Sequence, residues 1–266
     1  MARIDEPLEE MYANLVIEDE EMDEIVIANN TITEQKTTFM LMGKFLTEKT
    51  INFQAMKNLM ESLWRPREGM EVYSTGDLKY LFVFYHKMDV QNVMEGGPWS
   101  FEQAMLVLHQ VEMGDDPATV KLQNMEMWVQ IYDLPRGYVS ESILKSVGAS
   151  LGTYIKSGPG TFDGGWTPYV RIRVALNVDK PLKRSTKIKR EGNSWSWINF
   201  KYEKMGTFCF VCGIIGHSDR DCIVVYVNLE KVVEKMYGVW QRASSKRGQR
   251  NPGSKWLRNS GVRKED

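Results

Sequence analysis

Eight consecutive residues read Leu78-Lys79-Tyr80-Leu81-Phe82-Val83-Phe84-Tyr85, with three aromatic side chains at period two. Aromatic residues at this period predict a β-strand. Leu81 and Val83 between them are apolar too, so we expect both faces of the strand to be buried. The alternative is that Tyr80 and Phe82 form an open platform for bases, as on the aromatic strand of RNA-recognition motifs.

The segments around this strand predict a β-α-β-β-α-β order. We expect strands at Phe39–Leu46, Met70–Tyr73, Leu78–Tyr85 and Phe101–His109, helices at 52–63 and Lys87–Glu95, and a turn at Ser74–Asp77. This order is the split-βαβ, or ferredoxin-like, arrangement. In that arrangement both helices cover one face of the sheet and leave the other face free for a partner.

A second patterned block follows the polar break Gly114–Pro117. We expect strands at Met127–Tyr132, Tyr169–Val178 and Trp195–Tyr202, and a helix at Ser140–Leu151 with Ser140 as its N-cap. The strand order of this smaller α+β unit stays open. The predicted fold class is therefore α+β, with a ferredoxin-like, RRM-like βαββαβ domain before the smaller unit.

The composition divides the chain into six predicted segments. They are an acidic arm (1–35), the ferredoxin-like domain (36–113), the small α+β domain (118–204), a zinc knuckle (205–224), a short helix or strand segment (225–240) and a basic disordered tail (241–266).

Charge is distributed unevenly along the 266 residues, although the formal net charge is only −1. Residues 1–30 contain ten acidic residues and one basic residue, whereas residues 171–266 carry a net charge of +12. A basic C-terminal third favours an anionic partner such as nucleic acid, and ordinary charge scatter is the alternative.

The acidic start is unlike a secretory signal, and no run of apolar residues approaches the length of a membrane span. We therefore expect an intracellular protein with no membrane partner, in the nucleus or the cytoplasm, with the nucleus favoured.

All three cysteines fall in one window with the spacing C-x2-C-x4-H-x4-C, formed by Cys209, Cys212, His217 and Cys222. Three thiolates and one imidazole make a closed tetrahedral shell for Zn²⁺, which has no open position for catalysis. The alternative is free cysteines with an incidental histidine. We predict a structural zinc site in an independently folded module.

Five basic residues lie close together before Trp195 and Trp197, namely Lys183, Arg184, Lys187, Lys189 and Arg190. Cations that can contact phosphates, with aromatic residues nearby, suit the binding of single-stranded nucleic acid. The alternative is that the lysines lie in water at the edge of a hairpin and prevent pairing with other strands. We predict nucleic-acid contacts at these five residues and at Trp195, Phe210, Arg220, Arg242, Lys246 and Arg247.

The cysteine window resembles the zinc knuckle of retroviral and retrotransposon Gag-type proteins, with its aromatic at Phe210 and its Gly213-x-x-Gly216-His217 core. The residue after the histidine is Ser218, where knuckles that grip bases usually carry a second bulky side chain. Stacking on Phe210 alone should therefore be weak.

A wider likeness spans residues 36–243. It rests on Leu41-Met42-Gly43-Lys44-Phe45-Leu46-Thr47, Gly96-Gly97-Pro98-Trp99-Ser100-Phe101, Val129-Gln130-Ile131-Tyr132-Asp133-Leu134-Pro135 and Tyr237-Gly238-Val239-Trp240-Gln241-Arg242. These resemble a large plant family in which a domain of unknown function precedes one knuckle, often in LINE-type retrotransposon frames. The resemblance implies a Gag-like protein that binds RNA or single-stranded DNA.

We expect no catalytic residues. His86 and His109 have no matching nucleophile or carboxylate pattern, and no phosphate-binding glycine loop occurs. The favoured function is non-enzymatic binding of RNA or single-stranded DNA with Zn²⁺ as the cofactor. The alternative is an adaptor that binds proteins through the knuckle and the folded domains.

Overall fold

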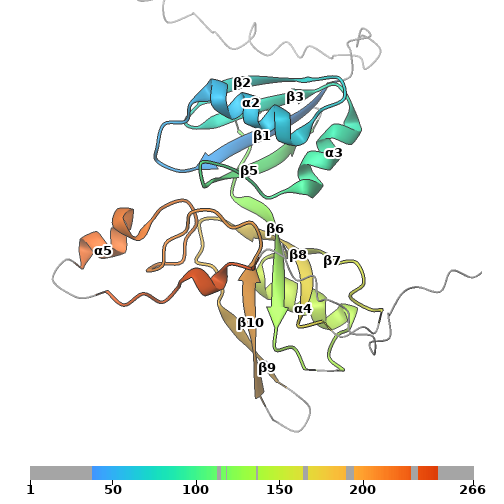
Figure 1. The fold of residues 1–266 in the computed structure, drawn as a ribbon, viewed down its shortest axis with the longest axis vertical. Coiled ribbons are helices and arrows are strands. Elements are labelled where there is room, and N and C mark those ends of the chain that lie inside the picture. Colours follow the sequence, from blue (N-terminus) through green and yellow to red (C-terminus); the bar gives the residue numbers. More distant parts are fainter. Residues whose placement is uncertain are drawn as a thin grey trace, which may run out of the picture. The chain divides into compact units, whose positions relative to one another are not determined.

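The structure is a computed structural model, and it describes residues 38–244 except 113–114, 118, 136, 164–166, 190–194 and 229–232. The described residues belong to one compact unit. It is a mixed α+β fold with two antiparallel five-stranded sheets (Figure 1). The predicted acidic arm and residues 245–266 of the predicted tail lie outside the described residues.

The first sheet has the order β2-β3-β1-β5-β4. Its strands are β1 (Phe39–Leu46), β2 (Met70–Gly76), β3 (Lys79–Phe84), β4 (Trp99–Phe101) and β5 (Ala104–Val111). Helix α2 (Phe53–Trp64) follows β1, and α3 (Lys87–Gly96) follows β3. The predicted succession of elements is present, with the short strand β4 added at the edge.

Two predicted boundaries in this sheet are wrong. The turn expected at Ser74–Asp77 is formed instead by Asp77 and Leu78, both with positive φ (48° and 58°). The strand expected at Phe101–His109 is split by a turn at Glu102-Gln103, again with positive φ at both residues. Neither turn has glycine at its centre, which is why the residue types did not indicate it.

One face of the first sheet packs under α2 and α3. Phe82 is fully buried and Tyr80 is 5% exposed, in a cluster that includes Met56, Met60 and Trp64 of α2. The ring centroids of Trp64 and Phe82 are 4.9 Å apart in an edge-to-face arrangement. The preferred interpretation of Tyr80 and Phe82 as core residues is confirmed.

The opposite face of the first sheet is not free for a partner, so that expectation is corrected. Met42, Met105 and Val107 point to this face, and all three are fully buried. They belong to the same buried cluster as Met127 and Val129 of the second sheet. The face is apolar, so covering it with the second block removes a large hydrophobic area from water.

The second sheet has the order β7-β8-β6-β10-β9. Its strands are β6 (Asn124–Tyr132), β7 (Thr153–Ser157), β8 (Tyr169–Asn177), β9 (Ser185–Lys189) and β10 (Trp195–Tyr202). Helix α4 (Glu141–Leu151) begins after the predicted N-cap Ser140, whose Oγ accepts a hydrogen bond from the Ile143 amide. The strands β7 and β9 were not predicted.

Two cations of the second block hold the C-terminal end of α3. Arg173 is 1% exposed, and its guanidinium donates to the carbonyls of Met94 and Glu95 while also pairing with Glu126 at 2.8 Å. Lys204 Nζ donates to the Gly96 carbonyl at 2.6 Å. The last carbonyls of a helix lack partners within the helix, so these contacts fasten the two blocks together.

After β10 the chain forms a 3-10 helix (Asp219–Asp221), α5 (Ile223–Val227) and a second 3-10 helix (Val239–Gln241). The segment predicted at 225–240 thus contains the end of α5 and part of the last of these turns. Among the described residues, no helix is both long and apolar enough to cross a membrane.

Candidate metal centre and nucleic-acid interface

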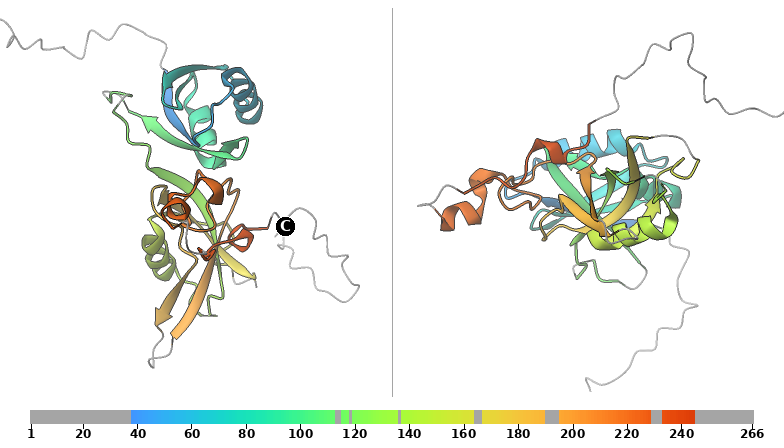
Figure 2. Two further views of the ribbon diagram at one scale, coloured as in Figure 1. Left: turned by 90° about the vertical axis from the view of Figure 1, so that its left-hand side faces the viewer. Right: turned by 90° about the horizontal axis from the view of Figure 1, so that it is seen from below.

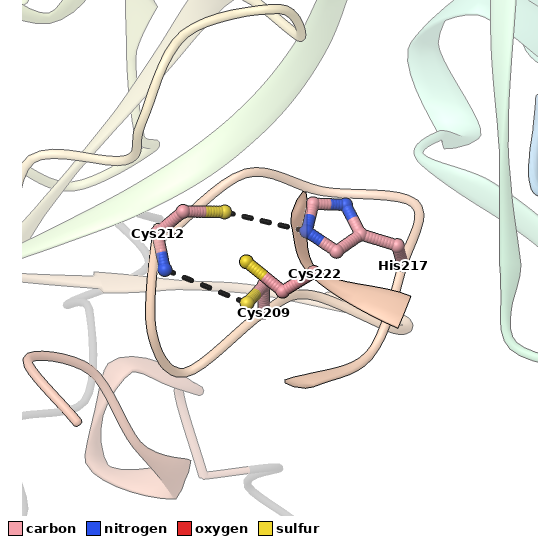
Figure 3. A group of neighbouring side chains, drawn as sticks. All are labelled: Cys209, Cys212, His217 and Cys222. Atoms are coloured by element: carbon pink, nitrogen blue, oxygen red, sulfur yellow. Dashed lines mark hydrogen bonds between the residues drawn. The ribbon is translucent and has the colours of Figure 1, made fainter. Parts of the chain in front are cut away.

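The four predicted ligands converge on one point (Figure 3). Their ligand atoms all lie within 4.8 Å of one another. The Sγ atom of Cys212 is 3.3 Å from His217 Nε2, so the imidazole turns this nitrogen towards the thiols. Cys209 and Cys222 are buried, and Cys212 and His217 are half-buried.

A short turn brings the first two cysteines together. The backbone amides of Val211 and Cys212 both point at Cys209 Sγ, at 3.3 and 3.4 Å. Gly213 donates to the Cys209 carbonyl at 3.0 Å, and its φ of 76° is one that residues with a side chain rarely adopt. Amides aimed at a sulfur stabilise it as a thiolate.

Burial and hydrogen bonding act differently on the thiols. Burial raises the pKa of Cys209 to about 12. Burial also acts to raise the pKa of Cys222, but the hydrogen bond with His217 and nearby backbone amides outweighs it and lowers that pKa to about 7. A metal held here displaces protons from the thiols, so its affinity falls as the pH falls.

The donor set fits a tetrahedral Zn²⁺ ion. With zinc–sulfur bonds of about 2.3 Å, two sulfur ligands lie about 3.8 Å apart, and the observed spread of ligand atoms within 4.8 Å needs only a small contraction. Thiolate and imidazole ligands suit Zn²⁺, whereas Mg²⁺ and Ca²⁺ prefer oxygen ligands. Four protein ligands complete the shell.

The knuckle is packed into the core of the fold. Phe208 and Ile215 on either side of the turn pair as a β-bridge, and both belong to the buried cluster that contains the two sheets. The Thr207 amide donates to the Gln103 carbonyl in the β4–β5 turn at 2.9 Å. A Cβ on Gly216 would lie 3.1 Å from the side chain of Leu46, so the approach to β1 is close.

The segment after α5 closes over the knuckle. The Tyr237 amide donates to the Phe210 carbonyl at 2.9 Å. The Tyr237 ring lies where a Cβ on Gly213 would be, at 2.2 Å, so only glycine fits there. Arg184 holds this segment from the other side, because it donates to the Met236 carbonyl at 2.8 Å and lies 5.3 Å from the Tyr237 ring.

Phe210, the predicted stacking residue, is half-buried. Its ring packs edge-to-face on Phe208 with centroids 5.0 Å apart, and it contacts the main buried cluster. Its backbone amide donates to Asp219 Oδ1 at 2.6 Å. Base stacking on Phe210 stays a prediction, and the ring has less free surface for it than the sequence suggested.

Two lysines of the basic run, Lys187 and Lys189, lie with the two tryptophans on the β9–β10 hairpin. Trp195 pairs with Lys189, and Trp197 pairs with Lys187, in the antiparallel register. The ammonium groups lie 5.7 and 4.9 Å from the respective ring centroids. Both tryptophans are more than half exposed, at 60% and 56%. The hairpin carries aromatic and cationic groups on one open face.

The other predicted nucleic-acid residues are dispersed. Arg220 is exposed on the knuckle, and Lys183 is exposed before β9. Arg242 donates to the Gly206 carbonyl at 2.7 Å and lies 5.6 Å from the Phe208 ring, so it has a structural contact like that of Arg184. Arg190, Lys246 and Arg247 lie outside the described residues.

Sequence reasoning missed two residues on the same face as the tryptophans. Lys201 of β10 lies 4.6 Å from the ring of Tyr132 on β6. The signal was present in β10, where Trp195, Trp197, Asn199 and Lys201 alternate with buried Ile198, Phe200 and Tyr202. The strand order that brings Tyr132 beside them was not predictable from the pattern.

Two protein families match parts of the chain. Residues 33–119 match a family described as a domain of unknown function, DUF4283, and residues 176–224 match a family described as a zinc knuckle. This pair of domains is typical of plant proteins. The zinc-knuckle match includes the β9–β10 hairpin as well as the four ligands.

An uncharacterised protein of Arabidopsis thaliana is 22% identical over 135 residues, which cover 51% of this chain and 42% of that protein. The chain thus spans about two fifths of the length of this relative. Among solved structures, the Sxl-lethal protein in complex with RNA is 14% identical and covers 62% of this chain and 99% of its own. Its TM-score of 0.23 is too low to bear on fold or function.

Proposed function

We propose that this protein holds one Zn²⁺ ion at Cys209, Cys212, His217 and Cys222 and binds single-stranded RNA or DNA through its second sheet and basic residues. The ion would act structurally, because all four positions of a tetrahedral shell are taken by protein. On this proposal the protein is not an enzyme. The knuckle supplies the rigid support and the hairpin supplies the contacts.

The observation that carries the proposal is the pair of exposed tryptophans, each beside a lysine, on the hairpin. An exposed cation–π pair contributes about 0.5–1 kcal/mol, whereas a base stacked on an aromatic ring contributes about 1–3 kcal/mol. A base therefore displaces the ammonium group from the ring, and the lysine becomes available to a phosphate. The hairpin offers both contacts that single strands need.

Stacking alone gives little affinity, since even millimolar binding takes about 4 kcal/mol. Phosphate contacts must supply the remainder, which makes binding tolerant of sequence and sensitive to salt. For single strands we expect the logarithm of the binding constant to fall by about 0.7 per phosphate contact for each tenfold rise in salt.

The test uses the full chain and fluorescently labelled, unrelated single-stranded oligonucleotides, titrated at several salt concentrations. Trp197→Ala should weaken binding about fivefold to 150-fold, the range that one stacked base supplies. Trp240→Ala is the matched control, because Trp240 is 57% exposed and belongs to the last 3-10 helix, not to β9 or β10. Absence of salt-dependent binding at physiological ionic strength would contradict the proposal.

A second candidate function is protein binding, and the short helix α5 favours it. Ile223, Tyr226 and Val227 are 74%, 62% and 77% exposed. Side chains with this much apolar surface are usually buried. Exposed apolar side chains side by side are uncommon outside interaction sites. An adaptor would bind no oligonucleotide, so the titration above separates the two functions.

We also propose a Gag-like, retrotransposon-derived origin and an RRM-like first domain. The order of a DUF4283 domain and one knuckle supports the origin. The strand order β2-β3-β1-β5 with two helices on one face supports the fold assignment. A location in the nucleus or the cytoplasm, with the nucleus favoured, remains our expectation for a protein with this ligand.

A further inference from the structure

The open face of the second sheet extends beyond the hairpin. The opposite face is buried, because Leu144 and Val147 of α4 share a cluster with Ile131, Ile172 and Ile198. The other face therefore carries the alternate residues of each strand. Among them Gln130 and Arg173 are buried, and Tyr132 and Tyr169 are half-buried. Five of the alternate residues are aromatic. Arg171 lies over Trp128 on β6 at 3.9 Å, and the other four follow one another across the sheet, namely Trp195 and Trp197 on β10, Tyr132 on β6 and Tyr169 on β8.

The register of the strands places the four rings on a diagonal path. Trp195 and Trp197 lie two residues, or about 6.6 Å, apart along β10. Asn199 is paired with Tyr132, so Trp197 and Tyr132 are diagonal neighbours about 7–8 Å apart. Tyr132 is paired with Tyr169, and their ring centroids are 5.2 Å apart.

This spacing suits a single strand and not a duplex. Stacked bases in a duplex follow each other at about 3.4 Å along one strand, roughly half the first two steps of the path. A base on each ring must therefore be separated from its neighbours, which only an extended strand allows. The part of β10 with both tryptophans pairs only with β9, and this hairpin extends past the neighbouring strands (Figures 1 and 2).

Cations accompany the path. Lys189, Lys187 and Lys201 lie 5.7, 4.9 and 4.6 Å from the rings of Trp195, Trp197 and Tyr132. Among the described residues, none of these three ammonium groups takes part in an ion pair. Each of three successive rings thus has one lysine beside it, and a nucleic-acid strand has one phosphate for each base.

The carboxylates on this face already have partners. Glu203 pairs with Arg171 at 2.7 Å and accepts from Gln130. Asp133 accepts a hydrogen bond from Asn199 Nδ2 at 2.7 Å. Repulsion of phosphates is thereby reduced, and the lysines determine the charge that an approaching strand meets.

The path ends at a cavity of about 610 Å³, lined by Tyr169, Arg171, Lys204 and Arg242 among others. Glu203 lines the cavity too and pairs with Arg171, while Lys204 and Arg242 donate to backbone carbonyls. A cavity of this size is within the usual range for a small-molecule ligand, so it can take the nucleotide beyond the last stacked base.

We infer that a single-stranded nucleic acid lies diagonally across this face, from the β9–β10 hairpin over Tyr132 to Tyr169, with one base on each ring. This inference rests on the proposed function and deepens it, because it makes Tyr132 and Lys201 contacts and sets a site of at least four nucleotides. The ligand is an extended, unpaired strand. The protein contacts the flat faces of its bases with aromatic rings and its phosphates with lysines.

The experiment measures binding of the full chain to labelled oligothymidylates and oligouridylates of two, four and eight nucleotides by fluorescence anisotropy. For the natural sequence we expect affinity to rise steeply from two to four nucleotides and less steeply from four to eight, because the cavity takes a further nucleotide. Tyr132→Leu should weaken binding to the longer probes at least fivefold, the lower end of the stacking range. Lys201→Gln should lower the salt dependence.

Tyr73→Leu is the matched control, because Tyr73 is a half-exposed tyrosine on a strand of the first sheet. Tyr132→Phe keeps the ring and removes only the hydroxyl, which donates to Gln130 at 2.9 Å. It should bind like the natural sequence, and it separates loss of the ring from damage to the fold. Unchanged thermal unfolding is required of each variant.

The outcomes distinguish the inference from the proposed function. If Trp197→Ala weakens binding while Tyr132→Leu and Lys201→Gln do not, the hairpin binds nucleic acid and the path across β6 and β8 is wrong. If Tyr73→Leu weakens binding as much as Tyr132→Leu, the path is also wrong. If the natural sequence binds none of the probes, the proposed function itself fails.

Discussion

The two sheets have the same number of strands and the same antiparallel pairing, but they differ in what covers them. In the first sheet the central strands β1 and β5 are covered on both faces, by α2 and α3 on one side and by the core of the second block on the other. The second sheet is covered by α4 on one face and leaves Trp195 and Trp197 exposed on the other. Sheets with the same number of strands can thus differ in which faces remain exposed.

The strand sequences explain this difference. In β3 the aromatic residues alternate with Leu81 and Val83, so neither face can remain in water without a large hydrophobic cost. In β10 the buried phase holds Ile198 and Phe200, while the open phase holds tryptophans together with Asn199 and Lys201. Aromatic residues on the solvent-facing side of a strand are typical of a surface that binds a partner.

The helix-free face of the first sheet and the open face of the second sheet carry different side chains. The helix-free face of the first sheet carries the fully buried Met42, Met105 and Val107. Exposed aromatic side chains with lysines beside them lie instead on the second sheet. The knuckle lies between the blocks, with Phe208 and Ile215 in the shared core.

The largest effect should follow from zinc removal. Structural zinc sites contribute roughly 10 kcal/mol in isolated finger peptides, and here Phe208 and Ile215 join the knuckle to the core of both sheets. Chelation, or Cys222→Ser, should lower the thermal unfolding temperature of the second sheet as well as of the knuckle. Near-ultraviolet circular dichroism of the tryptophans follows this unfolding.

Re-addition of Zn²⁺ is the control for chelation and should restore the unfolding temperature, but it should not rescue Cys222→Ser. The sequence predicted an independent module that unfolds alone. Loss of order confined to residues 205–224, with an unchanged unfolding temperature elsewhere, would restore that prediction and contradict the packing described above.

Much of the fold follows from the sequence because its signals are local. The strands predicted at Phe39–Leu46 and Trp195–Tyr202 have the bounds of β1 and β10 in the structure, and Ser140 caps α4 as its side chain suggests. Three short strands were missed. The lysines of β9 have low strand propensity, and β4 and β7 follow neighbouring elements without a clear break.

Of the candidate site, the zinc ligands were predictable from the sequence, but the contacts between distant residues were not. The four ligands were identified because the spacing of Cys209, Cys212, His217 and Cys222 is itself the chemical requirement. The burial of Arg173 under α3 and the approach of Tyr132 to Lys201 depend on contacts between distant parts of the chain. A single sequence carries no local pattern for such pairings.

A smaller effect should come from removing one aromatic ring from each sheet. Phe82→Ala should lower the free energy of unfolding by about 3–5 kcal/mol, because the ring is fully buried. Trp197→Ala should change it by no more than about 0.5 kcal/mol, since the side chain is more than half exposed. Urea unfolding at equilibrium measures both values.

The same two variants should show the reverse order in oligonucleotide binding. Folded Phe82→Ala protein should bind as the natural sequence does, and Trp197→Ala should not. A folded Phe82→Ala variant that loses binding would mean that the first sheet is the recognition surface after all. The covered face described for that sheet would then have to open in solution.

The smallest expected effect distinguishes two cations that are three residues apart. Lys187 lies on the open face beside Trp197, at 4.9 Å. Arg184 already donates to the Met236 carbonyl and lies over Tyr237, where it holds the segment that closes the knuckle. If the open face meets the phosphates, Lys187→Gln should reduce the salt slope of binding by about 0.7, the value of one phosphate contact on a single strand. Arg184→Gln should leave the slope unchanged and instead lower the unfolding temperature. Equal slopes for the two variants would show that charge acts along the whole basic run and not through the open face of the second sheet.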